Sequence, residues 1–196
     1  LGKRGAGRRA SAGALKAGWG GASAVDEDGS QVAALVVANP FGAATMPGGG
    51  TLWSWALERD VEMGGQLPPG AVNALADDTP TDGQLGGNTT LAVVATNVTL
   101  DKAQAKRVAI MAHDGMARAI RPIHTPFDGD VVFALSTTRL PLLEPAIGAL
   151  ARIGALAADC LTRAIGRSVF EAEALGPFSS YRESHREAFA DGGDLG

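Results

Sequence analysis

The amino-acid sequence predicts a mixed α/β domain, because three short apolar strands alternate with two longer amphipathic helices. Residues 31–38, 89–96 and 130–137 are apolar and rich in β-branched side chains, which is typical of buried strands. Residues 101–120 and the segment 144–168 repeat apolar side chains at three- and four-residue steps, which predicts helices. The expected order is strand, long loop, strand, helix, strand, helix.

The first expected strand follows a part of the chain that has no clear pattern. Residues 1–24 are rich in glycine, alanine and basic side chains without a period, so we expect a loop there. The acidic residues and glycine of segment 26–30 predict a turn. The apolar run 31–38 then ends at Asn39 and Pro40, which bounds the strand.

A long connection separates the first strand from the second. Residues 40–88 are rich in glycine and proline, so we expect irregular structure with at most a weak helical turn near 53–59. A connection of this length inside a compact domain is usually functional or mobile. At the other end of the chain, residues 176–196 are polar, and we expect a frayed tail.

The two expected helices differ in how much of their surface is apolar. The helix 101–120 has one apolar stripe and ends before Pro122; the stripe consists of Val108, Met111, Ala112, Met116, Ala119 and Ile120. The helix that follows Pro145 is apolar on most sides, so we expect it to be buried. The rest of the chain does not obviously supply a layer to cover it, which suggests that the sequence is part of a longer one.

Composition excludes several classes of protein. A net charge of −4 and a pI near 5.3 argue against a general binder of nucleic acid or of anionic membranes. A single cysteine excludes a disulfide framework and a cysteine-based zinc site. The basic start of the chain lacks the apolar core of a signal peptide, so we expect a cytoplasmic protein.

Several short motifs have simpler explanations than the function they suggest. The run GAGRRA at 5–10 matches a dinucleotide-binding pattern, but no strand precedes it. The sequons at Asn88 and Asn97 flank a segment that is expected to be buried, so we reject glycosylation. His113 and His124 lack a third ligand at metal spacing, and helix-surface and loop-packing roles are simpler.

The start of the second strand allows two interpretations. Gly86, Gly87 and Asn88 precede Thr89, the first residue of the expected strand. Threonine is common in strands, so β propensity alone can explain it. Alternatively, the hydroxyl of Thr89 attacks the preceding carbonyl group, and hydrolysis frees an N-terminal threonine whose α-amine serves as general base.

Several segments together carry a more specific signal. They are 88–96 (NTTLAVVAT), 100–107 (LDKAQAKR), 112–119 (AHDGMARA) and 124–130 (HTPFDGD), with 33–42 and 62–66 upstream. In this order they resemble the DmpA-like peptidases, the family of L-aminopeptidase/D-esterase and β-aminopeptidase enzymes. The resemblance covers roughly residues 15–175.

The resemblance implies a fold and a processing event. The fold would be part of a four-layer αββα sandwich of the N-terminal-nucleophile type. Cleavage between Asn88 and Thr89 would make residues 1–88 the end of an α chain and residues 89–196 the β chain. The peptidase domain would span 1–175.

The resemblance also assigns roles to individual residues. Thr89 would be the nucleophile, and the side-chain amide of Asn39 would help to form the oxyanion hole. Asp128 and Asp130 would orient the nucleophile and its amine. Thr90 is the other candidate hydroxyl, but its side chain should point to the opposite face of the strand.

Two functions remain open from the sequence. The first is a self-processing aminopeptidase or amidase that removes N-terminal residues from small peptides, amides or esters, without metal or cofactor. Its two chains would associate into α/β heterodimers and a higher homo-oligomer. The second is an inactive folding or assembly module. Family members are longer at the N-terminus, and Tyr181 cannot replace a tyrosine that lies there. The apolar helix 145–168 would also suit subunit packing.

Overall fold

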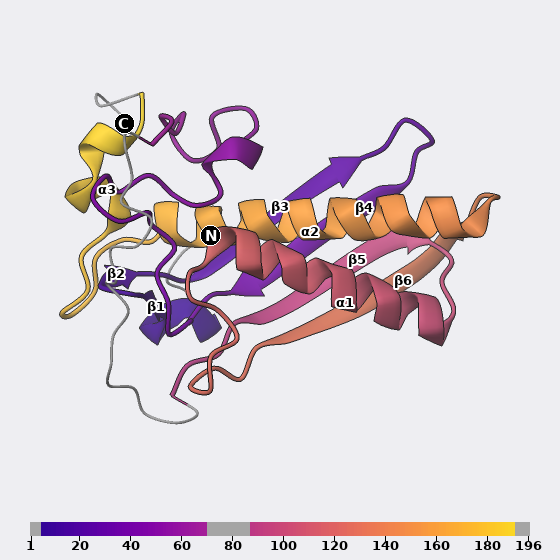
Figure 1. Cartoon of the computed structure of the whole chain (residues 1–196), viewed down its shortest axis with the longest axis horizontal. Helices are drawn as coiled ribbons and strands as arrows, with labels where there is room; N and C mark the ends of the chain where they lie inside the picture. The colour runs from indigo at the N-terminus through magenta and orange to yellow at the C-terminus, as the bar shows by residue number, and fades with distance from the viewer. Residues whose placement is uncertain (1–4, 70–86, 191–196) are drawn as a thin grey trace.

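The computed structural model describes residues 5–69 and 87–190, and these residues form a mixed α/β fold around a four-stranded sheet (Figure 1). The order of the strands in the sheet is β3 (Trp19–Val25), β4 (Gln31–Val37), β5 (Leu91–Val98) and β6 (Val131–Leu140). The pairs β3–β4 and β4–β5 are antiparallel, whereas β5 and β6 are parallel. The predicted fold class is therefore confirmed.

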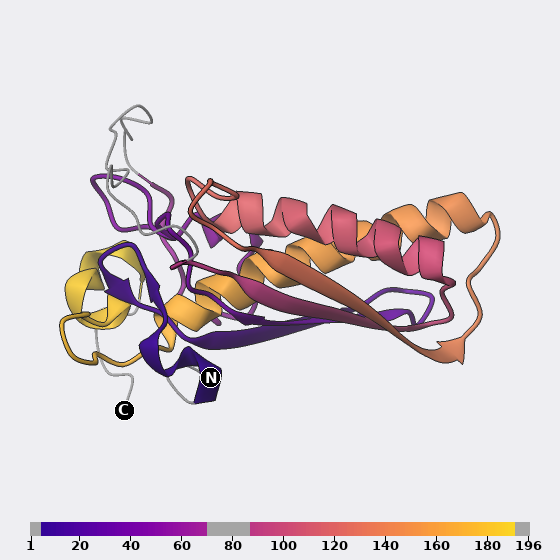
Figure 2. The ribbon, with the colours of Figure 1, turned by 90° about the horizontal axis from the view of Figure 1, so that it is seen from below.

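Two long helices, α1 (Lys102–Ala119) and α2 (Ala146–Phe170), lie together on one face of this sheet (Figure 2). α1 connects the parallel strands β5 and β6, as a crossover helix must. It begins with a capping box, in which the backbone N–H groups of Asp101 and Gln104 each donate to the other residue's side chain at 2.8 Å. The apolar face of α1 predicted from the sequence packs into the core, where Ala112 and Met116 are fully buried.

The opposite face of the sheet is apolar and exposed among the described residues. Leu35, Val93 and Phe133 are neighbours across β4, β5 and β6, and Leu135 lies further along β6. Leu35, Phe133 and Leu135 are each more than half exposed, at 51%, 54% and 55%. The described residues thus supply one four-stranded sheet and one helical layer on it, which is half of the sandwich implied by the resemblance.

Strand β3 lies, except for its last residue, in the segment 1–24 that the sequence predicted to be a loop. Its sequence consists mostly of small residues, which do not indicate a strand. Its packing against α2 explains why they are small. A Cβ atom at Gly20 would lie 2.1 Å from the carbonyl oxygen of Ala164 and 2.7 Å from the backbone nitrogen of Ser168. α2 therefore rests directly on the backbone of β3, which leaves no space for the side chains that usually mark a strand.

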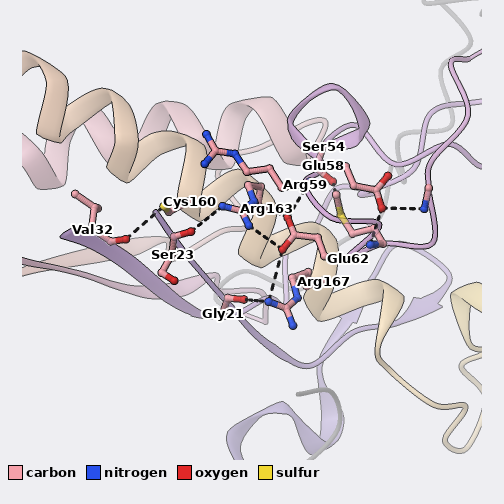
Figure 3. Close-up of polar contacts among 12 residues, drawn as sticks. Gly21, Ser23, Val32, Ser54, Glu58, Arg59, Glu62, Cys160, Arg163 and Arg167 are labelled. Carbon is pink, nitrogen blue, oxygen red and sulfur yellow. Dashed lines mark hydrogen bonds and ion pairs between the residues drawn. The ribbon is translucent and has the colours of Figure 1, made fainter. Parts of the chain in front are cut away.

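α2 has the covering layer that the sequence did not obviously supply. β3 and β4 cover one side of it and α1 covers another, so that Leu161 and Ile165 are fully buried. One charge on this helix is buried as well: Nε and Nη2 of Arg163 donate to the carboxylate of Glu62 at 2.5 and 2.9 Å, and Nη1 donates to the carbonyl oxygen of Ser23 at 2.9 Å (Figure 3). This ion pair ties α2 to the long connection.

The C-terminal segment differs from the expected frayed tail. Residues 176–190 contain α3 (Tyr181–Ser184) and the 3₁₀ turn η3 (Arg186–Ala188). Tyr181 is fully buried against the rings of Phe170 and Phe189, and its hydroxyl donates to the side-chain oxygen of Gln66 at 3.0 Å. Burial raises the pKa of Tyr181 to about 12.

The remaining segments are short. The run GAGRR at the start forms a 3₁₀ turn, η1 (Gly5–Arg9), and is followed by a small hairpin of β1 (Ser11–Ala12) and β2 (Leu15–Lys16). The weak helical turn expected near 53–59 is η2 (Trp55–Leu57). The connection expected over 40–88 is largely irregular as far as residue 69, and residues 70–86 lie outside the described part.

Candidate active site

Thr89 lies two residues before the start of β5, where the chain passes the end of β4. Its backbone N–H donates to the carbonyl oxygen of Asn39 at 2.8 Å. Its side-chain hydroxyl donates to the carbonyl oxygen of Asn88 at 2.6 Å. The hydroxyl therefore touches the carbonyl group of the peptide bond that joins Asn88 to Thr89.

The Asn88 carbonyl oxygen accepts a second hydrogen bond from the backbone. The N–H of Gly129 donates to it at 3.0 Å, as part of a bridge between Asn88 and Asp128. A Cβ atom at position 129 would lie 3.1 Å from the Thr89 hydroxyl oxygen, so glycine permits the close approach. Two donors thus polarise this carbonyl group, which makes its carbon more susceptible to attack.

Asn39 is held in place on both sides of its amide group. Pro40 restricts its backbone to an extended conformation. Its side-chain oxygen accepts from the backbone N–H of Ser11 at 3.1 Å, and its side-chain nitrogen donates to the carbonyl oxygen of Gly87 at 3.3 Å. The amide therefore lies beside the segment that leads into Thr89, with its donor on the Gly87 carbonyl group.

A buried lysine fixes the hairpin that contacts Asn39. Lys16 is 1% exposed, and its ammonium group donates to the carbonyl oxygens of Gly7 and Ala10 at 2.9 and 2.6 Å, and to that of Ala17. These bonds close the first turn and the β1–β2 hairpin onto each other. The sequence interpretation missed this residue, because a lysine in a segment without a period is usually exposed.

The carboxylate of Asp128 connects two loops. One oxygen accepts the backbone N–H of Phe41 at 2.9 Å, and the other accepts the backbone N–H and the hydroxyl of Thr125 at 3.0 and 2.6 Å. The rings of Phe41 and Phe127 pack at a centroid distance of 4.7 Å beside it. Asp128 therefore joins the loop after α1 to the segment after Asn39.

The carboxylate of Asp130 connects the residue that follows Thr89 to the loop after α1. One oxygen accepts the backbone N–H of Thr90 at 2.7 Å, and the other is 2.7 Å from Nδ1 of His124. Its side chain is only 2% exposed. Thr90 itself is fully buried whereas Thr89 is partly exposed, which agrees with the expectation that the two side chains point to opposite faces.

The structure therefore brings together all four residues that the resemblance selected. The backbone N–H of Thr89 is hydrogen-bonded to the carbonyl oxygen of Asn39. The residue before it, Asn88, forms a β-bridge with Asp128. The residue after it, Thr90, donates its backbone N–H to the carboxylate of Asp130. The sequence interpretation did not select Gly129 or His124 for the site. Both lie in the run HTPFDGD that carries the resemblance, so a signal for them was present.

His113 and His124, the two histidines of the metal-site alternative, are neighbours in space. The rings of His113 and His124 meet edge to face at a centroid distance of 5.0 Å. Burial lowers the pKa of His113, and the nearby His124 contributes to the shift, whereas Asp130 and Asp114 oppose it. Within residues 5–69 and 87–190, no three histidine, cysteine or acidic side chains gather closely enough to hold a metal ion.

The same described residues contain no helix that is both long enough and apolar enough to span a lipid bilayer. The longest helix, α2, has 25 residues and carries the buried Arg163 in its second half.

A family comparison identifies the class of protein that this fold and site represent. The model of peptidase family S58 matches residues 1–182, so the chain belongs to this family. The match confirms the resemblance to the DmpA-like peptidases that the sequence motifs indicated.

Relatives by sequence include named hydrolases. An uncharacterized aminopeptidase of Mycobacterium bovis is 38% identical over 201 residues, which cover 96% of this chain and 58% of the relative. A 6-aminohexanoate-oligomer endohydrolase of Kocuria is 33% identical over 150 residues, which cover 72% of this chain and 41% of the relative. The chain thus matches 58% of the length of the first relative and 41% of the length of the second.

Solved structures share the fold. The L-aminopeptidase D-Ala-esterase/amidase of Ochrobactrum anthropi, described as a variant of the Ntn hydrolase fold, aligns with a TM-score of 0.62 and 23% identity over 89% of this chain and 46% of its own. A β-aminopeptidase of Burkholderia aligns with a TM-score of 0.61 and 20% identity over 95% of this chain and 54% of its own. At these identities the likeness shows the fold alone.

Proposed function

We propose that this chain is part of a self-processing hydrolase whose nucleophile is Thr89, released as an N-terminal residue by cleavage after Asn88. One observation carries the proposal most directly. The Thr89 hydroxyl lies 2.6 Å from the Asn88 carbonyl oxygen, and the same oxygen accepts the Gly129 N–H at 3.0 Å. The attacking group, the carbonyl group under attack and a donor for the developing charge are therefore adjacent.

Self-cleavage begins with a shift of the acyl group from nitrogen to oxygen. The hydroxyl oxygen of Thr89 bonds to the carbonyl carbon of Asn88, and the Gly129 N–H stabilises the negative charge that forms on the carbonyl oxygen. The bond between this carbon and the Thr89 nitrogen then breaks, and the nitrogen takes up the hydroxyl proton. Water hydrolyses the resulting ester, which leaves a carboxylate on Asn88 and a free amine and hydroxyl on Thr89.

The released threonine then acts on substrates by the same chemistry. Its α-amine, whose reference pKa is about 7.7–8.0, accepts the hydroxyl proton during attack and passes it to the leaving group. The Asn39 amide, which binds Gly87 in the uncut chain, turns to the oxyanion of the substrate. Asp128 and Asp130 hold the loops on either side of the nucleophile and orient its amine.

The proposed substrates are small molecules with an amide or ester bond at an N-terminal residue. The aminopeptidase name of the mycobacterial relatives supports this class, and the Kocuria relative acts on 6-aminohexanoate oligomers according to its name. A free threonine nucleophile with its own amine as base requires no metal or cofactor. We also propose that the two products remain associated as an α/β heterodimer, which assembles further.

Substitution of Thr89 tests the proposal in protein expressed from the complete coding sequence. Denaturing intact-mass analysis of the wild-type protein should show two pieces with the break after Asn88. Thr89→Ala should stay whole and hydrolyse no aminoacyl anilides, because it lacks an attacking oxygen, whereas Thr89→Ser should retain part of both activities.

Thr90→Val is the matched control for these variants. The Thr90 hydroxyl is buried without a hydrogen-bond partner among the described residues, so its removal should leave cleavage intact. An uncut wild-type protein that still hydrolyses amides, or a Thr89→Ala variant as active as the wild type, would contradict the proposal.

A second candidate is an assembly module without activity. It is favoured by the apolar sheet face of Leu35, Phe133 and Leu135, since exposed apolar patches often mark interaction surfaces. The long helix that first suggested this function does not support it, because α2 is largely covered by α1 and the sheet. A stable oligomer with neither cleavage nor turnover would favour the module over the hydrolase.

A further inference from the structure

His124 is joined to the candidate nucleophile through a chain of short hydrogen bonds. Its Nδ1 lies 2.7 Å from one carboxylate oxygen of Asp130, and the other oxygen of Asp130 accepts the backbone N–H of Thr90 at 2.7 Å. A carboxylate oxygen accepts but does not donate, so Nδ1 of His124 carries the proton of the first bond. Asp130 therefore has one oxygen on the imidazole ring and the other on the residue after Thr89.

The backbone of Thr90 is held on both of its polar groups by the segment that begins β6. Its N–H donates to the side chain of Asp130, and its carbonyl oxygen accepts the N–H of Val131 at 3.1 Å. The N–H that Asp130 binds belongs to the peptide group between Thr89 and Thr90, which is attached directly to the α-carbon of Thr89. The orientation of the Asp130 carboxylate thus helps to determine where the Thr89 hydroxyl lies relative to the Asn88 carbonyl group.

The backbone of His124 has an unusual conformation for a side-chain-bearing residue. Its φ angle is +57°, in the left-handed region that favours glycine and is tolerated by asparagine. Conformations of this kind persist where surrounding structure holds them, and they are frequent at functional sites. Here the conformation accompanies a ring that is 39% exposed and a partner carboxylate that is 2% exposed.

We propose that His124 is a positioning residue, which acts through Asp130 and Thr90 to place Thr89 for self-cleavage and for turnover. The inference rests on the proposed function, because it assigns His124 a part in that same site. His113 is the natural comparison. Its ring packs edge to face with that of His124, but of the two histidines it is His124 that is hydrogen-bonded to the Asp130 carboxylate among the described residues.

Three variants of the protein, expressed from the complete coding sequence, separate the hydrogen bond from the backbone conformation. His124→Gly keeps the left-handed conformation accessible but removes the donor. His124→Asn tolerates the same conformation and places an amide N–H near the position of Nδ1. His113→Gln changes the neighbouring ring and leaves the bond between His124 and Asp130 in place.

Two measurements report on the role of His124. The first is the rate of cleavage after Asn88, followed by denaturing intact-mass analysis, together with kcat and KM for an aminoacyl anilide. Because hydrogen bonds to charged groups are among the stronger ones, we expect His124→Gly to slow cleavage by about 10- to 100-fold and to lower kcat more than it raises KM. The second is amide hydrogen exchange at Thr90, which should be faster in His124→Gly than in His124→Asn.

The outcomes distinguish this inference from the function on which it rests. An uncut wild-type protein would contradict the proposed function itself. A wild-type protein that is cut, together with a His124→Gly variant that is cut equally fast, would overturn the role of His124 alone. Equal slowing by His124→Asn and His124→Gly would also overturn it, since the donor would then not be the part that matters. Wild-type cleavage rates in His124→Asn and His113→Gln, with slow cleavage in His124→Gly, are the expected result.

Discussion

Gly115 of α1 and Ala158 of α2 mark the point at which the two helices touch backbone to backbone. A Cβ atom at Gly115 would lie 2.3 Å from the carbonyl oxygen of Ala158, which no flexible side chain can relieve. Close to this contact, the hydroxyl of Thr162 donates to the carbonyl oxygens of Gly115 and Ala158 at 3.1 and 2.9 Å. The distance between the helices is therefore set by the absence of a side chain at one position.

We expect Gly115→Ala to destabilise the protein even though alanine is the better helix former. Overpacking of this kind typically costs about 1–3 kcal/mol, which exceeds the gain of about 1 kcal/mol in helix propensity. Gly148→Ala in α2 is the matched control, because its nearest contact would be Pro145 at 3.8 Å, and we expect it to be neutral or stabilising. Urea unfolding measures both, and equal stability of the two variants would contradict this account of the crossing.

The buried ion pair between Glu62 and Arg163 gives a second prediction. The two side chains are only 12% and 9% exposed, so Glu62→Gln leaves the charge of Arg163 buried without its partner. Loss of one partner of such a pair typically costs about 3–5 kcal/mol. Chemical denaturation should show this loss in the free energy of unfolding.

The exposed pair Arg118–Asp159 provides the control for that experiment. Its side chains are 49% and 32% exposed, and Asp159→Asn should cost at most about 1 kcal/mol. Similar losses for Asp159→Asn and Glu62→Gln would mean that burial does not determine the contribution of the Glu62–Arg163 pair.

His113 makes stability depend on pH in a defined direction. Burial holds its pKa in the folded protein below the ordinary value of 6.5, so the unfolded chain binds more protons between the two values. Stability should therefore fall as the pH drops through about 6.5. His113→Gln removes this contribution, and its free energy of unfolding should change less between pH 7.5 and pH 5.5 than that of the wild type. An identical pH dependence in both proteins would rule out His113 as a source.

The sequence predicted the parts of the fold in which the pattern of apolar side chains indicates which residues are buried. The strands over 31–38, 89–96 and 130–137 and the two long helices all appear, with ends shifted by up to a few residues. The sequence did not predict β3, because its contact with α2 favours glycine and alanine, which have little strand preference. The sequence interpretation also failed for Tyr181, whose burial depends on Phe170 and on Gln66, more than a hundred positions away.

The residues of the candidate site could likewise be predicted only in part from the sequence. Thr89 could be selected from a local pattern of glycines, asparagine and a following strand, whereas Asn39, Asp128 and Asp130 required the family resemblance. The hydrogen bond from Gly129 to Asn88 is part of a parallel bridge between Asn88 and Asp128. The hydrogen bond between His124 and Asp130 involves a residue, His124, whose backbone is left-handed. Neither feature leaves a distinct periodic signal in a single sequence.

The antiparallel pairing of β4 with β5 determines how a protein cut after Asn88 would behave. The break would fall between these two strands, which pair over six positions from Val32–Thr96 to Val37–Leu91. α2, on the second product, also rests on β3 and β4 of the first. Dissociation of the two products would require breaking the hydrogen bonds between β4 and β5. It would also expose the buried face of α2. In native buffer the nicked protein would thus migrate as one indivisible particle, and only a denaturant would reveal its two polypeptides.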